Sequence, residues 1–94
     1  MNRILSAKEI ERISKAIGDP YRLKIMDLIN REANRVQCAA ILETVNLAQS
    51  TVSHHIKQLI DADLLITEKE GRNISYQVNK DVFNAYINYL NRFI

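Results

Sequence analysis

The 94-residue sequence is first informative for what it lacks. It has a single cysteine, so no disulfide can form within one chain, and this fits a reducing compartment. Its apolar runs are only a few residues long, too short to span a membrane. The polar segment after Met1 lacks the apolar core of a signal peptide. The sequence therefore predicts a cytoplasmic protein that does not enter a membrane.

The hallmarks of common enzyme classes are also missing. There is no glycine-rich phosphate loop, no activated nucleophile and no paired acid and base. We therefore expect no enzymatic activity and no cofactor. The net charge of +2 is only mildly basic, with 13 Lys and Arg against 11 Asp and Glu. Any nucleic-acid surface must therefore be built from a few well-placed cations.

The composition that is present predicts a single globular domain over residues 1–94, since 47% of the residues are hydrophobic and 26% charged. A first helix is predicted for residues 6–17, where Ser6 and Glu9 have the spacing of a capping box. Gly18 is expected to close this helix in the left-handed conformation.

A second helix is predicted to begin with Asp19 as N-cap and Pro20 at the first helical position, where the missing N–H costs nothing. We expect residues 30–36 to hold its end and a loop. Its charged residues Arg22, Lys24 and Arg31 are expected to be solvated rather than to contact phosphates. A broad apolar face makes it the central core helix: Leu23, Ile25, Met26, Leu28 and Ile29.

Residues 37–61 have the pattern of a helix-turn-helix. A short helix is predicted for residues 37–45, followed by a turn at Asn46 and Leu47 and a second helix over residues 48–61. The second helix places Val52, Ile56, Leu59 and Ile60 on one face. The opposite face is neutral to basic and suits the base edges and phosphates of the DNA major groove: Gln49, Ser50, Ser53, His54 and Lys57.

After Asp63 the apolar period changes to two, which predicts a β-hairpin. Leu64 and Ile66 are expected to share a face in its first strand, and Ile74, Tyr76 and Val78 a face in its second. Gly71 is expected to supply the positive φ of the turn, beside the tip cations Lys69 and Arg72. A hairpin that directly follows a DNA-reading helix is the wing of a winged helix.

Residues 80–94 are predicted to form a last helix that is apolar over more than half its circumference. So small a domain cannot bury such a helix alone, which favours a homodimer joined by the first and last helices. The fold class is thus mainly α, a winged helix-turn-helix with about five helices and a two-stranded wing. The predicted dimer interface comprises Ile4, Leu5, Ile13, Phe83, Tyr86, Ile87, Leu90 and Phe93.

Three segments resemble the ArsR family of winged-helix repressors. They read GDPYRLKIMDLI, LAQSTVSHHIKQLIDADLL and EGRNISYQV, and the match covers residues 13–79. The resemblance implies a dimer that places two recognition helices in successive major grooves of an imperfect palindrome, with half-sites roughly 34 Å apart. It also implies base-edge or phosphate contacts by Gln49, Ser50, Thr51, Ser53 and His54.

The resemblance assigns further roles around the recognition helix. Lys57 suits a phosphate, and Arg72 at the wing tip either enters the minor groove or stays solvated. His55 lies closer to the apolar face, which favours a hydrogen bond within the domain over a DNA contact. Ala48 stands where many relatives have Ser or Thr as N-cap.

The sequence departs from the best-known relatives in its sensing residues. Arsenic-type relatives carry a Cys-x-Cys pair on the third helix, where this chain has only Cys38, and zinc-type relatives use histidines on the last helix, where it has Asp81 and no His. We therefore expect no metal site of the usual types. Cys38 is either an inert apolar side chain or a redox switch. In the second case Cys38→Ser would abolish any effect of peroxide on DNA binding.

The sequence thus predicts a dimeric, sequence-specific DNA-binding repressor. Two alternatives stay open: a thiol-responsive repressor that acts through Cys38, and a winged-helix module that binds another protein and no longer binds DNA. The salt dependence of DNA affinity separates the last from the other two, because phosphate contacts release counterions.

Overall fold

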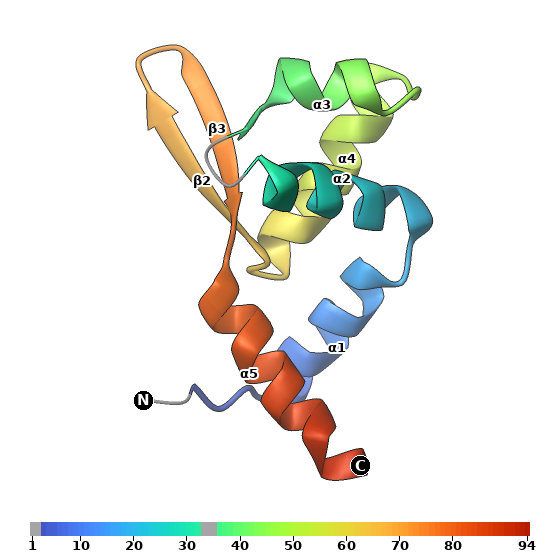
Figure 1. Ribbon diagram of the computed structural model, residues 1–94, viewed down its shortest axis with the longest axis vertical. Coiled ribbons are helices and arrows are strands. Elements are labelled where there is room, and N and C mark those ends of the chain that lie inside the picture. Colours follow the sequence, from blue (N-terminus) through green and yellow to red (C-terminus); the bar gives the residue numbers. More distant parts are fainter. Residues whose placement is uncertain (1–2, 33–35) are drawn as a thin grey trace.

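The computed structural model describes residues 3–32 and 36–94 (Figure 1). The order of the helices and the hairpin confirms the predicted winged helix-turn-helix. The sheet has three strands, whereas the sequence predicted two. In chain order the elements are α1 (Ala7–Ile17), α2 (Pro20–Arg31), β1 (Val36–Gln37), α3 (Cys38–Thr44), α4 (Gln49–Asp61), β2 (Leu65–Glu70), β3 (Asn73–Val78), α5 (Lys80–Leu90) and a 3₁₀ turn, η1 (Asn91–Phe93).

The first two helices begin as predicted. Ser6 accepts a hydrogen bond from the Glu9 N–H while the Glu9 carboxylate accepts one from the Ser6 N–H, which completes the capping box. Asp19 caps α2 by accepting from the N–H groups of Tyr21 and Arg22. Gly18 closes α1 as its C-cap, as predicted, but the expected left-handed conformation is wrong, because its φ is −82°. Glycine fits there by size, since a Cβ would lie 3.2 Å from the Ser14 carbonyl oxygen.

Part of the predicted loop, residues 33–35, lies outside the described residues. After it, Val36 and Gln37 form a strand that the sequence did not predict. This short strand pairs antiparallel with β3, so the sheet order is β1-β3-β2 and Val36 and Gln37 are held against the wing.

The hairpin forms as predicted, with Gly71 at φ 60° in the turn, but one face of β2 was assigned wrongly. Leu64 precedes the strand, and Leu65, only 3% exposed, is the β2 residue that packs into the core. Ile66 therefore points to the outer face, opposite Gln77, and is 40% exposed. The face of β2 was assigned wrongly because the turn that ends α4 extends through Leu64, so that the strand begins one residue later than the sequence pattern suggested.

That motif ends α4 without a glycine. Asp63 has a φ of 63°; its N–H donates to the Ile60 carbonyl and the Leu64 N–H donates to the Leu59 carbonyl. This is the Schellman pattern, in which a left-handed residue satisfies the last carbonyl groups of a helix. Arg3 and Asn79 also hydrogen-bond to Asp63, so the segment before α1 and the start of α5 meet at this turn.

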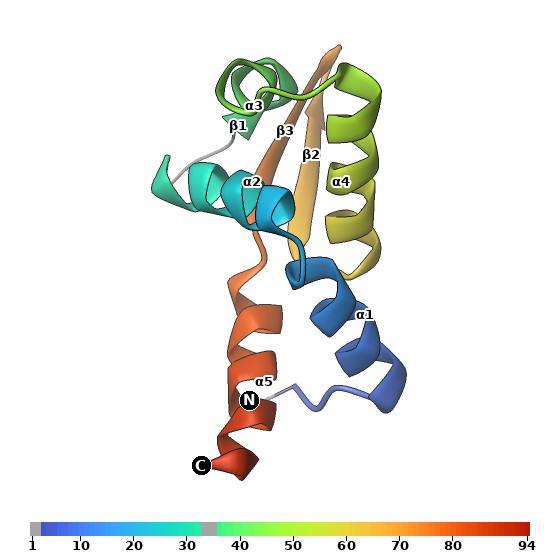
Figure 2. The same ribbon diagram turned by 90° about the vertical axis from the view of Figure 1, so that its right-hand side faces the viewer.

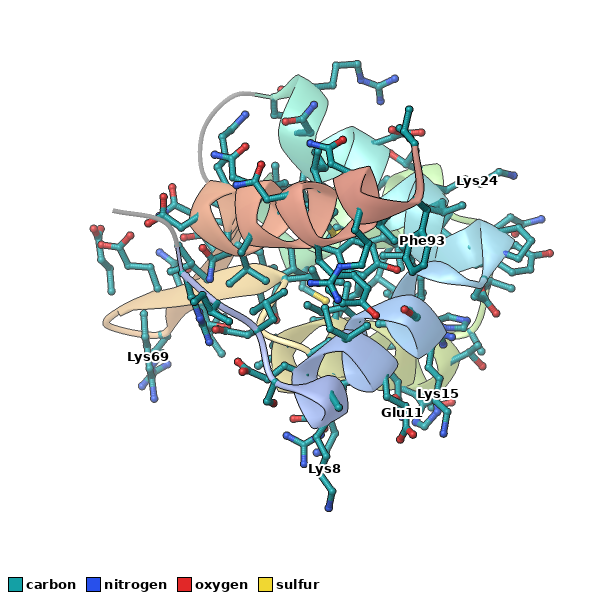
Figure 3. The ribbon with its side chains drawn as sticks, turned by 90° about the horizontal axis from the view of Figure 1, so that it is seen from below. Lys8, Glu11, Lys15, Lys24, Lys69 and Phe93 are labelled. Carbon is teal, nitrogen blue, oxygen red and sulfur yellow. The ribbon has the colours of Figure 1, made fainter. Side chains whose placement is uncertain are left out.

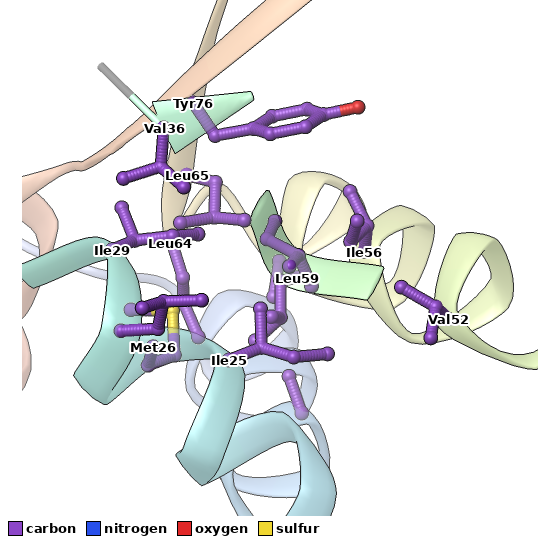
Figure 4. Close-up of a cluster of buried hydrophobic side chains, with 14 of the residues drawn as sticks. Ile25, Met26, Ile29, Val36, Val52, Ile56, Leu59, Leu64, Leu65 and Tyr76 are labelled. Atoms are coloured by element: carbon purple, nitrogen blue, oxygen red, sulfur yellow. The ribbon is translucent and has the colours of Figure 1, made fainter. Parts of the chain in front are cut away.

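The core lies between α2, α4 and the sheet (Figure 4). In this close-up Ile25 and Met26 of α2 face Leu59 and Ile56 of α4. The α2 prediction holds except for Leu23, which is 48% exposed because it lies on the edge of the apolar face. The fully buried side chains are Ile13, Ile25, Ile29, Ile41, Leu59, Leu64, Val52 and Val82.

Helices α1 and α5 form a separate end of the molecule, below α2 and the sheet in Figure 2. They are joined by a 2.7 Å hydrogen bond between the hydroxyl groups of Ser14 and Tyr86. The predicted last helix is shorter than expected, since it changes to a 3₁₀ turn after Leu90. Among the described residues, no helix is long and apolar enough to cross a membrane.

Candidate nucleic-acid interface

The face of α4 that the sequence singled out is uncovered. The side chains of Gln49, Ser50, Thr51, Ser53, His54 and Lys57 are all exposed. In Figure 2 this helix stands at the edge of the molecule, with one side turned away from all other elements. Its first turn contains no acidic residue, and its N-terminal end carries the positive end of the helix dipole. The surface thus offers hydrogen-bonding groups without negative charge, as a DNA groove requires.

The N-terminus of α4 is held only by its backbone. Ala48, the N-cap, makes no side-chain hydrogen bond, as its methyl group dictates. Its carbonyl oxygen still accepts from the Val52 N–H at 3.0 Å. The N–H groups of the first turn therefore receive no hydrogen bond from the side chain of the N-cap residue.

Lys57 lies about two turns after the start of α4 and pairs with Asp61 at 3.0 Å. Both side chains are largely exposed, so the pair contributes only about 0.3–0.5 kcal/mol. Such a weak contact leaves the ammonium group free to exchange Asp61 for another anion. The phosphate contact of Lys57 stays a prediction.

The wing carries its cations at the tip, as the sequence predicted. Lys69 and Arg72 flank the turn at Gly71 and are exposed. In Figure 3 the Lys69 side chain projects away from the body of the molecule. Positive charge at the end of a hairpin beside α4 is placed to reach a DNA backbone or minor groove.

The adjacent histidines of α4 face different surroundings. His54 is exposed, whereas His55 is only 8% exposed. Nδ1 of His55 lies 3.3 Å from the Arg22 guanidinium, and the Tyr21 ring stacks on the imidazole. The structural role predicted for His55 is thus confirmed. The expectation that Arg22 is solvated is wrong, because its side chain also hydrogen-bonds to the end of α1.

Comparison with known proteins identifies the family of this chain. Residues 17–68 match the model of a helix-turn-helix domain. The chain is 39% identical to an arsenical resistance operon repressor of Staphylococcus xylosus, over 89% of this chain and 78% of that protein. It belongs to the ArsR family of winged helix-turn-helix repressors.

Solved structures share the fold of this ArsR-family chain. An ArsR-like transcriptional regulator from Rhodococcus superposes with a TM-score of 0.81 at 20% identity, covering 92% of this chain and 79% of that one. A homodimeric winged helix-turn-helix DNA-binding domain from Mycobacterium bovis gives 0.73 at 23% identity, covering 88% and 76%. The family's members are repressors and not enzymes, which agrees with the sequence prediction.

The predicted dimer residues fall into two groups. Ile13 is 1% exposed and Tyr86 8%, so both lie in the protomer's own core, and their place in a dimer interface stays a prediction. Helix α1 packs against α2 and α4, and a hydrogen bond joins Ser14 of α1 to Tyr86 of α5. Leu5 and Phe83 are half-buried. The residues that remain open are Ile4, Ile87, Leu90 and Phe93, together with Ile94.

Cys38, the first residue of α3, is half-buried against the core. Burial, and to a smaller extent the neighbouring Cys38, raises the pKa of the Tyr76 hydroxyl. Within residues 3–32 and 36–94, no three His, Cys, Asp or Glu side chains come together as metal ligands do. The redox role of Cys38 stays a prediction.

Proposed function

We propose that this ArsR-family repressor binds an imperfect palindromic operator as a homodimer and blocks promoter access in the cytoplasm. Its whole chain then serves as one winged helix-turn-helix domain. The observation that carries the proposal is the uncovered α4 face, where exposed polar side chains stand on a helix whose other side is fixed in the core. A rigid helix with a free polar face can place side chains against base edges reproducibly.

Each exposed group on α4 has a role that its chemistry allows. Gln49 can read adenine through its amide, and Ser50 and Ser53 can serve a base or a phosphate. Thr51 has the same options as the serines, while His54 can donate to or accept from a base edge. The wing cations and Lys57 supply charge to the flanking phosphates.

Dimerisation is supported by the apolar surface on α5 and η1. Ile87 is 53% exposed, Leu90 40% and Phe93 72%, and the C-terminal Ile94 is fully exposed. Ile4, at 91%, comes from the segment before α1. Such residues clustered at one end of a small domain mark an interaction surface. The homodimeric state of the Mycobacterium bovis domain supports a second copy as the partner.

The first experiment selects DNA. Purified protein is incubated with fragmented DNA from its source genome, and the fraction bound at moderate salt is sequenced. We expect enrichment of a short imperfect palindrome. Recovery of no preferred sequence would contradict the proposal and favour the protein-interaction alternative.

The second experiment tests single residues on the recovered fragment. His54→Ala is expected to weaken specific binding by roughly 1–3 kcal/mol if the side chain reads a base. The control is Asn84→Ala, an exposed polar residue of α5 outside the proposed DNA surface. An equal affinity for His54→Ala and the control would remove His54 from the reading face.

Phosphate contacts are tested by salt. The logarithm of the affinity falls with the logarithm of salt concentration by about 0.9 for each phosphate contact. Lys57→Gln is therefore expected to reduce that slope by roughly two in a dimer, one for each subunit. An unchanged slope would show that Lys57 keeps its contact with Asp61 on DNA.

A further inference from the structure

Arg22, in the first turn of α2, connects the end of α1 to the recognition helix. Its Nε donates a hydrogen bond to the Ala16 carbonyl oxygen, and one terminal nitrogen donates to the Lys15 carbonyl oxygen at 3.1 Å. The other terminal nitrogen lies 3.3 Å from Nδ1 of His55 on α4. One guanidinium thus contacts two helices while its backbone belongs to a third.

The contacts with α1 suit the chemistry of a helix end. Carbonyl groups in the last turn of a helix lack partners within it, and that end carries partial negative charge. The guanidinium of Arg22 supplies both donors and positive charge to Lys15 and Ala16. These bonds place the guanidinium at a defined point relative to α1.

The contact with α4 requires one protonation state of His55. A guanidinium has five donors, no acceptor and a permanent charge. Nδ1 of His55 must therefore accept the hydrogen bond, so the imidazole is neutral with its proton on Nε2. The ring has little freedom to turn, because it is 8% exposed and Tyr21 stacks on it with centroids 6.2 Å apart and planes 24° apart.

We propose that Arg22 and His55 form a positioning pair that sets the orientation of α4 relative to α1. The proposal rests on the proposed function, in which α4 reads DNA and α1 lies at the dimer end. In a dimer, the angle between these helices determines how far apart the two recognition helices stand. Base-edge contacts require that distance to match the operator, whereas contacts to phosphates carry no sequence information.

The pair predicts a selective defect. Without it, each protomer still folds around its core, but α4 is less firmly oriented. Specific binding then weakens by about tenfold, the order expected for one hydrogen bond to a charged group. Binding to random duplex, which depends on charge, changes much less.

Three variants test the pair on the genomic fragment recovered above. His55→Phe keeps a ring and removes the acceptor, and Arg22→Lys keeps the charge and cannot span both helices. His55→Asn is the rescue control, because its amide oxygen can replace Nδ1 as an acceptor. Fluorescence anisotropy measures affinity for the fragment and for random duplex, while sedimentation and urea unfolding report dimerisation and stability.

We expect His55→Phe and Arg22→Lys each to lose about tenfold in specific affinity. A double variant that combines these two substitutions should bind no more weakly than the single variant with the lower affinity, because the effects of coupled residues do not add. His55→Asn should recover most of the affinity. The proposal is overturned if His55→Phe binds the fragment as the wild type does, if both DNA affinities fall equally, or if His55→Asn does not rescue. A wild-type chain without sequence preference would instead contradict the proposed function.

A measurement on the wild-type chain keeps the test decisive if the variants fail to fold. Long-range proton–nitrogen NMR spectra distinguish the two imidazole tautomers. They are recorded under the conditions of the DNA-binding measurements. The charged and titratable groups around His55 are Arg22 and Tyr21 of α2, the N-cap Asp19 and the neighbouring His54. We expect the His55 proton on Nε2, and a proton on Nδ1 overturns the pair.

Discussion

The two ends of the molecule differ in how completely they bury their apolar side chains. At the end formed by α2, α3, α4 and the sheet, Ile25 and Leu59 are 0% exposed within one chain. At the end formed by α1, α5 and η1, Ile87 is 53% exposed and Phe93 72%. Both ends have some exposed apolar side chains, such as Leu23 (48%) and Ile66 (40%) at the first, but the most exposed ones lie at the second end. This difference supports the proposal that the first end contacts DNA and the second end contacts the other protomer.

A leucine-to-alanine substitution at each end of the molecule should give the largest difference in stability between the two ends. Leu59→Ala is expected to lower the free energy of unfolding by about 2–5 kcal/mol, because it opens a cavity in a filled core. Leu90→Ala, at a residue 40% exposed, removes fewer contacts within the chain and, in the proposed dimer, also removes contacts to the second chain. Urea unfolding at several protein concentrations measures both. The loss should be independent of concentration for Leu59→Ala and should depend on it for Leu90→Ala; the reverse would contradict the comparison.

Charge at the exposed end should separate the protomers. Ile87→Glu combined with Leu90→Glu is expected to raise the dimer dissociation constant by at least about a hundredfold, because carboxylates would be buried without partners. Sedimentation equilibrium measures this. The control is Asn88→Glu, which adds charge to the same helix on a different face and should leave the dimer intact. A dimer that survives the double substitution must use another surface.

The two turns that flank β2, at Asp63 and at Gly71, both contain a residue with positive φ. Gly71→Ala is expected to cost about 1 kcal/mol, because its φ of 60° is unfavourable for a residue with a Cβ. Asp63→Gly should instead stabilise the chain by roughly 0.5 kcal/mol, since relief of its positive φ outweighs the exposed pair with Arg3. Thermal unfolding measures both changes. A loss of stability in both variants would show that Asp63 stabilises the turn through its side chain.

The smallest expected effect is a pH dependence at the α1–α2 junction. Partial burial acts to raise the pKa of the Asp19 carboxyl, but hydrogen bonds from the Arg22 and Tyr21 N–H groups and the nearby positive charge outweigh it and lower the pKa. A carboxyl with a lowered pKa stabilises the fold above its unfolded pKa and loses that contribution as pH falls through the folded value. Acid titration of stability should therefore be less steep for Asp19→Asn. An identical profile would show that the cap acts without its charge.

Local signals allowed much of this fold to be predicted. The capping box at Ser6, the Asp19-Pro20 helix start and the hairpin turn at Gly71 each depend on residues close in sequence, and all three formed. The polar face of α4 could be predicted because the alternation of buried and exposed side chains follows the helical period.

The features that the sequence did not reveal depend on distant residues. Strand β1 has only two residues and exists because Val36 pairs with Tyr76 of β3. The junction at Arg22 needs the end of α1 and His55 of α4 to meet, which no local pattern indicates. The burial of Ile13 and Tyr86 within one chain was not predicted either, and Tyr86 of α5 hydrogen-bonds to the distant Ser14 of α1.

We propose that one end of the chain binds DNA and that the other end joins two copies. The most direct test measures stoichiometry and affinity on the recovered palindrome and on a single half-site at the same salt concentration. We predict two chains on the palindrome and an affinity for the half-site that is weaker by at least about a hundredfold, because the second recognition helix is lost. One chain on each fragment, with equal affinity for both, would contradict the account.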